Sequence, residues 1–193
     1  MPAELPLLTF TDAEAFEAWI ADQPPDSAGA WLRFAKAGAP EPTLDKDAAI
    51  DAALCHGWVD SQIGRIDEHY FKTRFTPRKG RSIWSQRNRE RVEQLEAAGR
   101  MKRSGRAQVE AAKADGRWDA AYAPASKAEP CAETNAALDA SPKARAFFEG
   151  LDRANRYAIL WRIAQAKTPA KKTAKIAEMV AKLERGERFH EKR

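Results

Sequence analysis

The sequence predicts an α+β fold that is mainly helical, with a small antiparallel sheet of about three strands and a C-terminal helical module. Three observations predict it. The stretch AWLRFAKA (30–37) alternates apolar and polar residues, a hairpin pattern covers 58–76, and most of the remaining chain has helical periodicity. We therefore expect an α+β core domain over 1–124, a linker over 125–134 and a three-helix module over 135–193.

Two helices are predicted before the hairpin. The stretch FTDAEAFEAWI has Thr11 at a capping position, with apolar residues on one face, and Pro24 and Pro25 end it. The stretch TLDKDAAIDAALCHG carries acidic residues in its first turns, as the helix dipole favours, and Gly57 follows as the terminating residue.

The hairpin over 58–76 has a register that the apolar pattern restricts. A three-residue loop around Ile66–His69 places Val59 and Ile63 on the same face as Phe71 and Phe75. The opposite face is then polar and aromatic, with Asp60 beside Arg74, and it gathers Trp58, Asp60, Gln62, Tyr70, Lys72, Arg74 and Thr76.

Helices are predicted for most of the chain after the hairpin. The stretch RSIWSQRNRERVEQLEAAG forms a helix that Ser82 or Ser85 caps and Gly99 ends, and a second follows over about 104–114. Trp84 lies on the inward stripe of the first helix, Asn88 falls on it too, and Arg91 is close beside it. The three helices of the C-terminal module begin in SPKARAFFEGL, RANRYAILWRIAQAK and TPAKKTAKIAEMVAKLERG.

The composition is that of a globular protein. Hydrophobic residues make up 44% of the 193 residues, charged residues make up 32%, and the net charge is +5. No apolar run is long enough to span a membrane and no signal peptide is predicted, so we expect a cytoplasmic protein. Cys55 and Cys131 are expected to be free thiols.

Several motifs resemble those of the YdeI/OmpD-associated family, also called the bacteriocin-protection family. They lie in the stretch AALCHGWVDSQIGRIDEHYFKTRFTPRKGRSIWSQRNRERVEQLEAAGRM, in AKADGRWDAAY, and in the C-terminal stretches AFFEGLDRANRYAILWRIAQAK and KIAEMVAKLERGE, so the resemblance spans nearly the whole chain. Two departures are His56 before Gly-Trp and TPAKKTAK in the tail. The resemblance implies tolerance of bacteriocins or antimicrobial peptides, and an envelope protein partner through the family name only; it implies no reaction.

The charge is arranged in blocks. Residues 1–71 carry four basic and thirteen acidic side chains, whereas residues 72–106 carry twelve basic and three acidic ones. One hypothesis is that the blocks neutralise each other across the folded surface. The other is that residues 72–106 line a site for an anion, where guanidinium groups meet the amino end of a helix.

We therefore predict a basic, aromatic pocket for an anionic small molecule. Its candidate residues are Trp58, Asp60, Tyr70, Arg74, Arg78, Ser82, Trp84, Ser85, Asn88 and Arg91. Arginine binds phosphate or carboxylate with two parallel hydrogen bonds, and the aromatic side chains would stack on a ring. In the alternative interpretation, nearby carboxylates pair with the arginines, Trp84 is core, and Asn88 ties down the hairpin backbone.

Catalysis and nucleic-acid binding remain alternatives to a binding or protective role. An enzyme of unknown reaction would use the same pocket, and a nonspecific nucleic-acid surface would use residues 72–106. Cys55 and His56 are adjacent on a helix and do not face each other, and the three histidines have no zinc-ligand spacing. We therefore predict no catalytic residue, no cofactor and no metal site.

Overall fold

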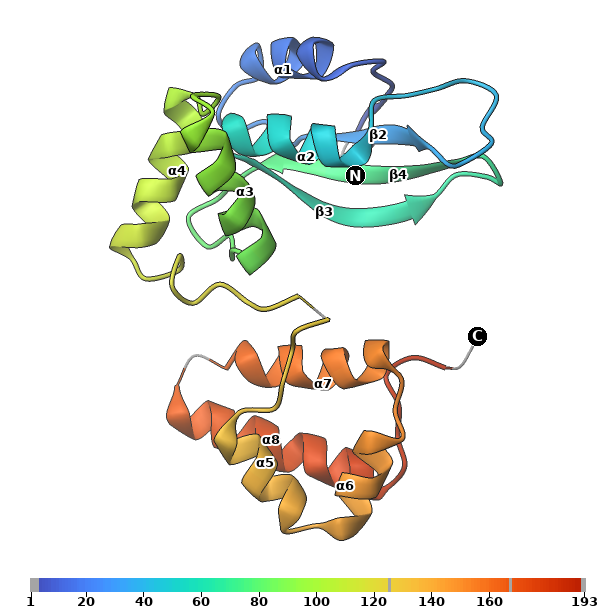
Figure 1. Cartoon of the computed structure of the whole chain (residues 1–193), viewed down its shortest axis with the longest axis vertical. Coiled ribbons are helices and arrows are strands. Elements are labelled where there is room, and N and C mark those ends of the chain that lie inside the picture. Colours follow the sequence, from blue (N-terminus) through green and yellow to red (C-terminus); the bar gives the residue numbers. More distant parts are fainter. Residues whose placement is uncertain (1–3, 125, 167, 192–193) are drawn as a thin grey trace. The chain divides into compact units, whose positions relative to one another are not determined.

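The structure is a computed structural model that describes residues 4–124, 126–166 and 168–191. It divides into two compact units, Met1–Ala121 and Tyr122–Arg193. In the first unit the order is β1 (Leu7–Leu8), α1 (Ala13–Ala21), β2 (Ala30–Ala35), α2 (Lys46–Cys55), β3 (Trp58–Arg65), β4 (Tyr70–Pro77), α3 (Gln86–Ala97) and α4 (Arg103–Ala114) (Figure 1). The second unit holds α5 (Ala132–Asp139), α6 (Pro142–Glu149), α7 (Arg153–Ala164) and α8 (Pro169–Glu184).

The α+β class is confirmed, and the sheet has four strands instead of the predicted three or so. The order is β1-β2-β4-β3. Because β1 pairs with β2 in parallel, while β2–β4 and β3–β4 are antiparallel, the sheet is mixed. The sequence did not predict β1 because its two residues are too few to alternate. Helix α1 lies between β1 and β2 in the chain and supplies the crossover that a parallel pair requires.

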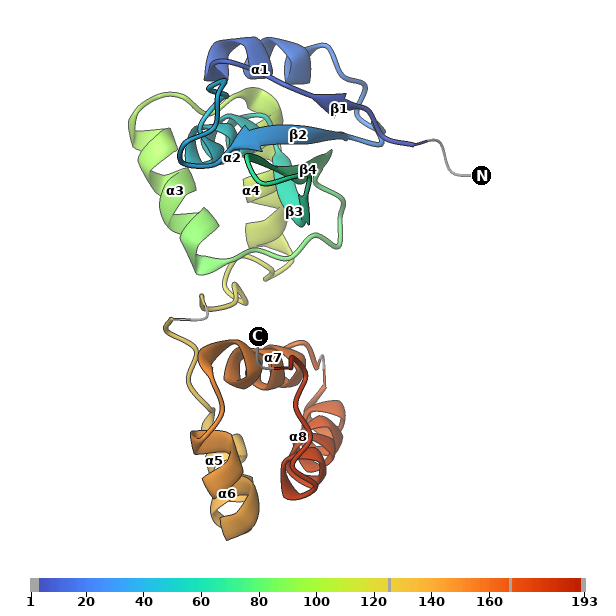
Figure 2. The ribbon, with the colours of Figure 1, turned by 90° about the vertical axis from the view of Figure 1, so that its right-hand side faces the viewer.

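Helices α1 and α2 cover one face of this sheet (Figures 1 and 2). The alternation in β2 explains why, because Ala30, Leu32 and Phe34 are buried in the cluster that also contains Phe16 of α1 and Phe75 of β4. The intervening residues of β2 and β4 lie on the other face. There the Lys72 ammonium lies 4.7 Å from the centre of the Trp31 ring, a cation–π contact.

The hairpin forms as predicted, and β4 divides its faces as predicted, but the faces predicted for Trp58, Val59 and Asp60 at the start of β3 are wrong. The loop contains four residues, 66–69, and Asp60 lies opposite Phe75. Trp58, two residues from Asp60, therefore shares the core face with Phe75, and Val59 turns to the other face. A register shift between Asp60 and Ile63 then returns Ile63 to the face of Phe75, as predicted for this residue.

A second cluster holds α3 and α4 together. Trp84 is 1% exposed, and its ring centre lies 4.9 Å from that of Trp118. As predicted, Ser85 caps α3, since its side chain accepts a hydrogen bond from the Asn88 backbone N–H, and Gly99 follows the end of the helix with a φ of 68°.

The second unit contains four helices in its described part, whereas the sequence predicted three. Helix α5 begins at Ala132, inside the segment expected to be a linker. The sequence did not predict α5 because its apolar pattern is weak: Leu138 is its one large buried hydrophobic residue. Leu138 joins a core with Phe148 of α6, Ile159 of α7 and Met179 of α8.

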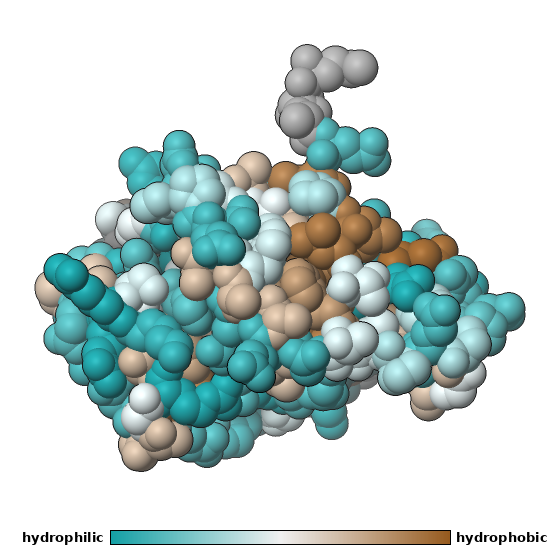
Figure 3. Space-filling view, turned by 90° about the horizontal axis from the view of Figure 1, so that it is seen from above, coloured by the Kyte–Doolittle hydropathy of each residue, from teal (hydrophilic) through white to brown (hydrophobic). Residues whose placement is uncertain are grey.

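None of the helices in the described ranges combines the length and apolar character that a membrane crossing requires. In the space-filling view, hydrophilic residues cover most of the visible face, and apolar residues gather in one area of it (Figure 3).

Asn155 is a fully buried polar residue that ties the end of the second unit to α7. Its Oδ1 atom accepts hydrogen bonds from the backbone N–H groups of Phe189 and His190, both at 2.9 Å, and its Nδ2 atom donates to the His190 carbonyl oxygen at 3.1 Å. We expect Asn155→Ala to lower the free energy of unfolding by about 1–3 kcal/mol, because the amides it serves lose their partner.

Urea denaturation, with hydrogen exchange at the Phe189 and His190 amides, measures this effect. The exposed Lys143 offers a control, since Lys143→Ala should change stability by no more than about 0.5 kcal/mol. An Asn155→Ala variant as stable as that control, with unchanged exchange at both amides, would contradict the prediction.

Candidate functional site

A cationic pocket lies where β4 ends and the chain turns toward α3. Its volume is about 540 Å³. Three basic side chains line it, Arg74 from β4 and Lys79 and Arg81 from the turn that follows. Hydroxyl groups contribute to the same lining through Ser27, Ser61, Thr76 and Ser82. We call this site the cationic pocket.

The turn that carries Lys79 and Arg81 is held by local hydrogen bonds. Pro77 is the last residue of β4, and the Ser82 backbone N–H donates to the Lys79 carbonyl oxygen at 2.8 Å, closing a β-turn. The Ser82 hydroxyl accepts from the Lys79 N–H at 2.9 Å. Arg117 anchors the turn from outside, because its Nη1 atom donates to the Ser82 carbonyl oxygen at 2.9 Å.

Residues 26–28, far from β4 in the sequence, line the pocket as well. Gly29, with a φ of 84°, lets this segment lie against β4, since a Cβ atom there would be 2.0 Å from the Phe75 carbonyl oxygen. The Arg74 Nη2 atom donates to the Ala28 carbonyl oxygen at 3.4 Å. The segment also supplies Asp26, the one acidic residue of the lining.

In the part of the chain that the structure describes, the three cations of the pocket have no carboxylate partner. Within residues 4–124, 126–166 and 168–191, no ion pair involves Arg74, Lys79 or Arg81. The Arg74 Nε atom is buried and has no hydrogen-bond partner in the same part of the chain. The pocket therefore presents three positive charges that no described carboxylate neutralises, and among the side-chain donors of these three cations only Arg74 has a described partner, the Ala28 carbonyl oxygen.

The structure brings two of the ten candidate residues, Arg74 and Ser82, into this pocket. Two others, Trp58 and Arg78, line a neighbouring pocket of about 340 Å³ together with His56. The Arg78 guanidinium lies 3.6 Å from the centre of the Trp84 ring, and its Nη1 atom donates to the Ile83 carbonyl oxygen at 3.1 Å.

The three aromatic candidates are buried residues and do not line the cationic pocket. Trp58 packs on Trp19 in the core, and Trp84 packs on Trp118. Tyr70 is 7% exposed, and its hydroxyl donates to the Glu41 carbonyl oxygen at 3.3 Å. The expectation of a pocket with aromatic stacking surfaces is therefore not met at this site, because burial of the large rings stabilises the core.

The remaining candidates, Asp60, Ser85, Asn88 and Arg91, do not line the cationic pocket. Asp60 lies 4.0 Å from the Lys46 ammonium, and its cross-strand neighbour is Phe75 instead of the predicted Arg74. The Ser85 side chain accepts from the Asn88 N–H at 3.1 Å, which completes the cap of α3. The Ser85 hydroxyl therefore stabilises the start of α3 instead of lining the pocket.

Arg91 also has a structural role. Its Nη2 atom lies 2.6 Å from Asp47 and its Nη1 atom 2.6 Å from Asp51, so it joins α3 to α2. This contact joins the acidic and basic parts of the chain. It agrees with the hypothesis that the charge blocks neutralise each other.

Sequence reasoning missed several residues of the pocket for identifiable reasons. Arg81 belongs to the basic segment 72–106, but the sequence did not predict its position in the turn, so it was not among the candidate residues. Asp26 and Ser27 lie in a Pro-rich loop with no motif. The positive φ of Gly29, its close approach to β4 and the Arg74–Ala28 hydrogen bond bring that loop to the pocket.

His56 in the neighbouring pocket is a half-buried histidine beside a carboxylate. Its Nε2 atom lies 3.8 Å from Oε2 of Glu17. Burial lowers the pKa of His56, and this effect outweighs Glu17, which raises it, while the charge of Lys102 lowers it further. No group of three or more His, Cys, Asp or Glu residues in the described chain could hold a metal ion.

Comparisons with known proteins divide the chain in two. Residues 8–108 match a family model described as Domain of unknown function (DUF8412). Residues 129–186 match a family model described as Bacteriocin-protection, YdeI or OmpD-Associated. No curated protein and no solved structure matches the chain.

The second match confirms the resemblance that the sequence suggested, over a narrower range. It covers the C-terminal unit, whereas the resemblance was expected to span nearly the whole chain. Most of the motifs on which that expectation depended lie within residues 8–108, which match the other family model.

The lowered pKa of His56 predicts a pH dependence of stability. Between the usual histidine pKa of about 6.5 and the lower folded value, the unfolded chain binds a proton that the folded chain does not. The free energy of unfolding should therefore fall as the pH drops below about 6.5. We expect His56→Gln to remove this part of the slope in urea denaturation at pH 5, 6, 7 and 8.

A control is Gln62→Ala, which removes an exposed side chain that does not titrate. That variant should keep the wild-type slope. Parallel pH profiles for the wild type and His56→Gln would show that the histidine contributes nothing to the slope.

Proposed function

This chain belongs to the DUF8412 family, whose model covers residues 8–108, and from that premise we propose that its N-terminal unit binds a small anion in the cationic pocket. The observation that carries the proposal is that Arg74, Lys79 and Arg81 line one pocket without a carboxylate partner in the described chain. The ligand class is phosphate or carboxylate.

Physical chemistry favours an anion at this place. Three positive charges around one pocket repel one another, and the attraction of an anion bound between them offsets that repulsion. Each guanidinium can offer two parallel N–H donors to phosphate or carboxylate, and the hydroxyl groups of the lining can add further hydrogen bonds. Asp26 reduces the positive charge of the lining only in part.

The C-terminal match supports the proposal of a protective role for this binding protein. The description of that family names bacteriocin protection and association with OmpD. We propose that the protein is a non-catalytic binding protein that contributes to tolerance of bacteriocins or antimicrobial peptides, with an anion-binding N-terminal domain and a helical C-terminal domain.

An enzyme of unknown reaction is the second candidate. The neighbouring pocket supports it, because His56 lies there with Trp58 and Arg78. The lowered pKa of His56 favours its neutral form. A neutral imidazole can accept a proton, which a general base must do. A reaction would require His56, whereas anion binding in the cationic pocket would not.

Calorimetric titration of the full chain with inorganic phosphate tests the binding proposal. The double variant Arg74→Gln/Arg81→Gln should weaken binding at least tenfold, about 1.4 kcal/mol, because it removes two cations and their hydrogen-bond donors. Arg103→Gln/Lys102→Gln is the matched control, since both residues are exposed, belong to the same basic segment and do not line the pocket.

Two outcomes would overturn the proposal. One is phosphate affinity that the pocket variant leaves unchanged. The other is an equal loss in both variants, which would indicate a diffuse positive field instead of a site. Titration with a single-stranded oligonucleotide at several salt concentrations distinguishes the nucleic-acid alternative, whose log affinity would fall steeply and linearly with log salt.

A further inference from the structure

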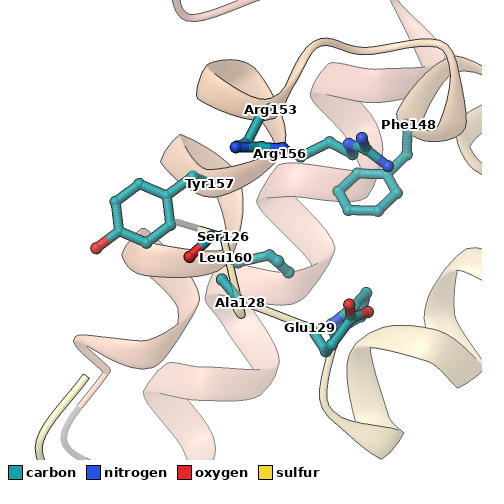
Figure 4. Close-up of a pocket in the computed structure, with 9 residues that line it drawn as sticks. Ser126, Ala128, Glu129, Phe148, Arg153, Arg156, Tyr157 and Leu160 are labelled. Carbon is teal, nitrogen blue, oxygen red and sulfur yellow. The ribbon is translucent and has the colours of Figure 1, made fainter. Parts of the chain in front are cut away.

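A separate pocket in the C-terminal unit has charges of both signs on its walls. It is small, about 210 Å³, and it lies between α7 and the segment 126–130, with Phe148 of α6 beside them (Figure 4). Arg153 and Arg156 enter its lining from the first turns of α7, and Glu129 enters from the segment 126–130. We call it the dipolar pocket.

The charged groups of the dipolar pocket do not neutralise one another. Within the described residues, no ion pair joins Glu129 to Arg153 or Arg156, and none joins any of the three to another residue. Other charges of the same unit do pair, since Lys172 lies 3.0 Å from Glu133 and Lys182 lies 2.9 Å from Glu187. The pocket thus holds two cations and one anion apart across a cavity.

The rest of the lining is apolar or aromatic. Phe148 is 5% exposed and Leu160 is 9% exposed, so the part of the wall that they form is well packed. Tyr157 adds a phenol, whose pKa is raised by burial and by the nearby Tyr122. Its hydroxyl therefore stays protonated at neutral pH and can donate a hydrogen bond.

We infer that the dipolar pocket binds a small zwitterion, namely a free amino acid with an apolar side chain. Its carboxylate would lie against the guanidinium groups of Arg153 and Arg156, which suit bidentate hydrogen bonding. Its ammonium group would lie against Glu129, and its side chain against Phe148 and Leu160. A lone anion would leave Glu129 unpaired and repelled, and a lone cation would do the same to both arginines.

The volume supports a ligand of this size. Pockets for drug-sized molecules occupy roughly 300–1,000 Å³, so a cavity of about 210 Å³ fits a smaller molecule. The inference does not depend on the anion proposed for the cationic pocket, because that pocket lies in the other unit.

Calorimetric titration of the full chain with three probes tests the inference. The probes are L-leucine, N-acetyl-L-leucine, which lacks the ammonium charge, and L-leucinamide, which lacks the carboxylate. We expect L-leucine to bind, and each blocked derivative to bind at least tenfold more weakly, since each loses one of the two charge interactions.

Three variants locate the site. Arg156→Gln and Glu129→Gln should each weaken L-leucine binding at least tenfold, and both keep a side chain of similar size at a residue that is exposed in the structure. Lys143→Gln is the matched control, because it removes one charge from the same unit outside the pocket. Circular dichroism verifies that every variant is folded.

The inference is overturned if folded wild-type protein does not bind L-leucine, or if N-acetyl-L-leucine binds as tightly as L-leucine. It is also overturned if Lys143→Gln weakens binding as much as the pocket variants do. Arg74→Gln/Arg81→Gln should bind L-leucine like the wild type, so failure of the anion proposal and failure of this inference remain distinguishable.

Discussion

The pairing register between β3 and β4 determines which side chains of the N-terminal unit enter the core. Because Asp60 lies opposite Phe75, Trp58 and Phe75 share the face that α1 and α2 cover. The register between β2 and β4, in which Arg74 lies opposite Trp31, sends Arg74 to the other face, beside the segment that ends at Gly29. A shift of one residue would exchange the two faces, so the cationic pocket depends on this pairing as much as the core does.

The basic residues of 72–106 separate into two groups by their surroundings. Arg91 and Arg106 pair with carboxylates and hold helices together, through Asp47 and Asp51 in one case and Glu96 in the other. The Arg106–Glu96 pair is exposed, and exposed pairs contribute little to stability, whereas the Arg91 side chain is largely buried. Arg74, Lys79 and Arg81 have no carboxylate partner in the described residues and line one pocket together. Lys102 and Arg103 also lack an ion-pair partner there but do not line the pocket, so the convergence of unpaired cations on one cavity, more than the total charge, distinguishes the candidate site.

Much of the fold could be predicted because its signals are local. Ser85 and Gly99 mark the ends of α3, and the alternation of β2 marks a strand with one buried face. The parts that could not be predicted depend on distant contacts or on irregular geometry. Leu7 and Leu8 form a strand only because β2 pairs with them, and the shift after Asp60 follows no pattern in the sequence.

The candidate site was harder to predict than the fold for the same reason. Arg74 and Ser82 belong to elements next to each other in the chain, and their meeting followed from the hairpin and the turn. The contribution of Ser27 required a loop from before β2 to return to β4. The aromatic candidates were misplaced because an amphipathic pattern does not distinguish a ring that lines a cavity from one that fills the core.

The irregular pairing in β3 has a further consequence for how this protein behaves in solution. β3 is at the edge of the sheet, and Ile63 on it is 63% exposed, which is a combination that invites strands of other molecules to add to the sheet. The register shift between Asp60 and Ile63 interrupts the regular row of backbone donors and acceptors that an added strand would need. The bulge thereby disfavours the addition of a further strand beside Ile63, the most exposed large hydrophobic residue of the described strands.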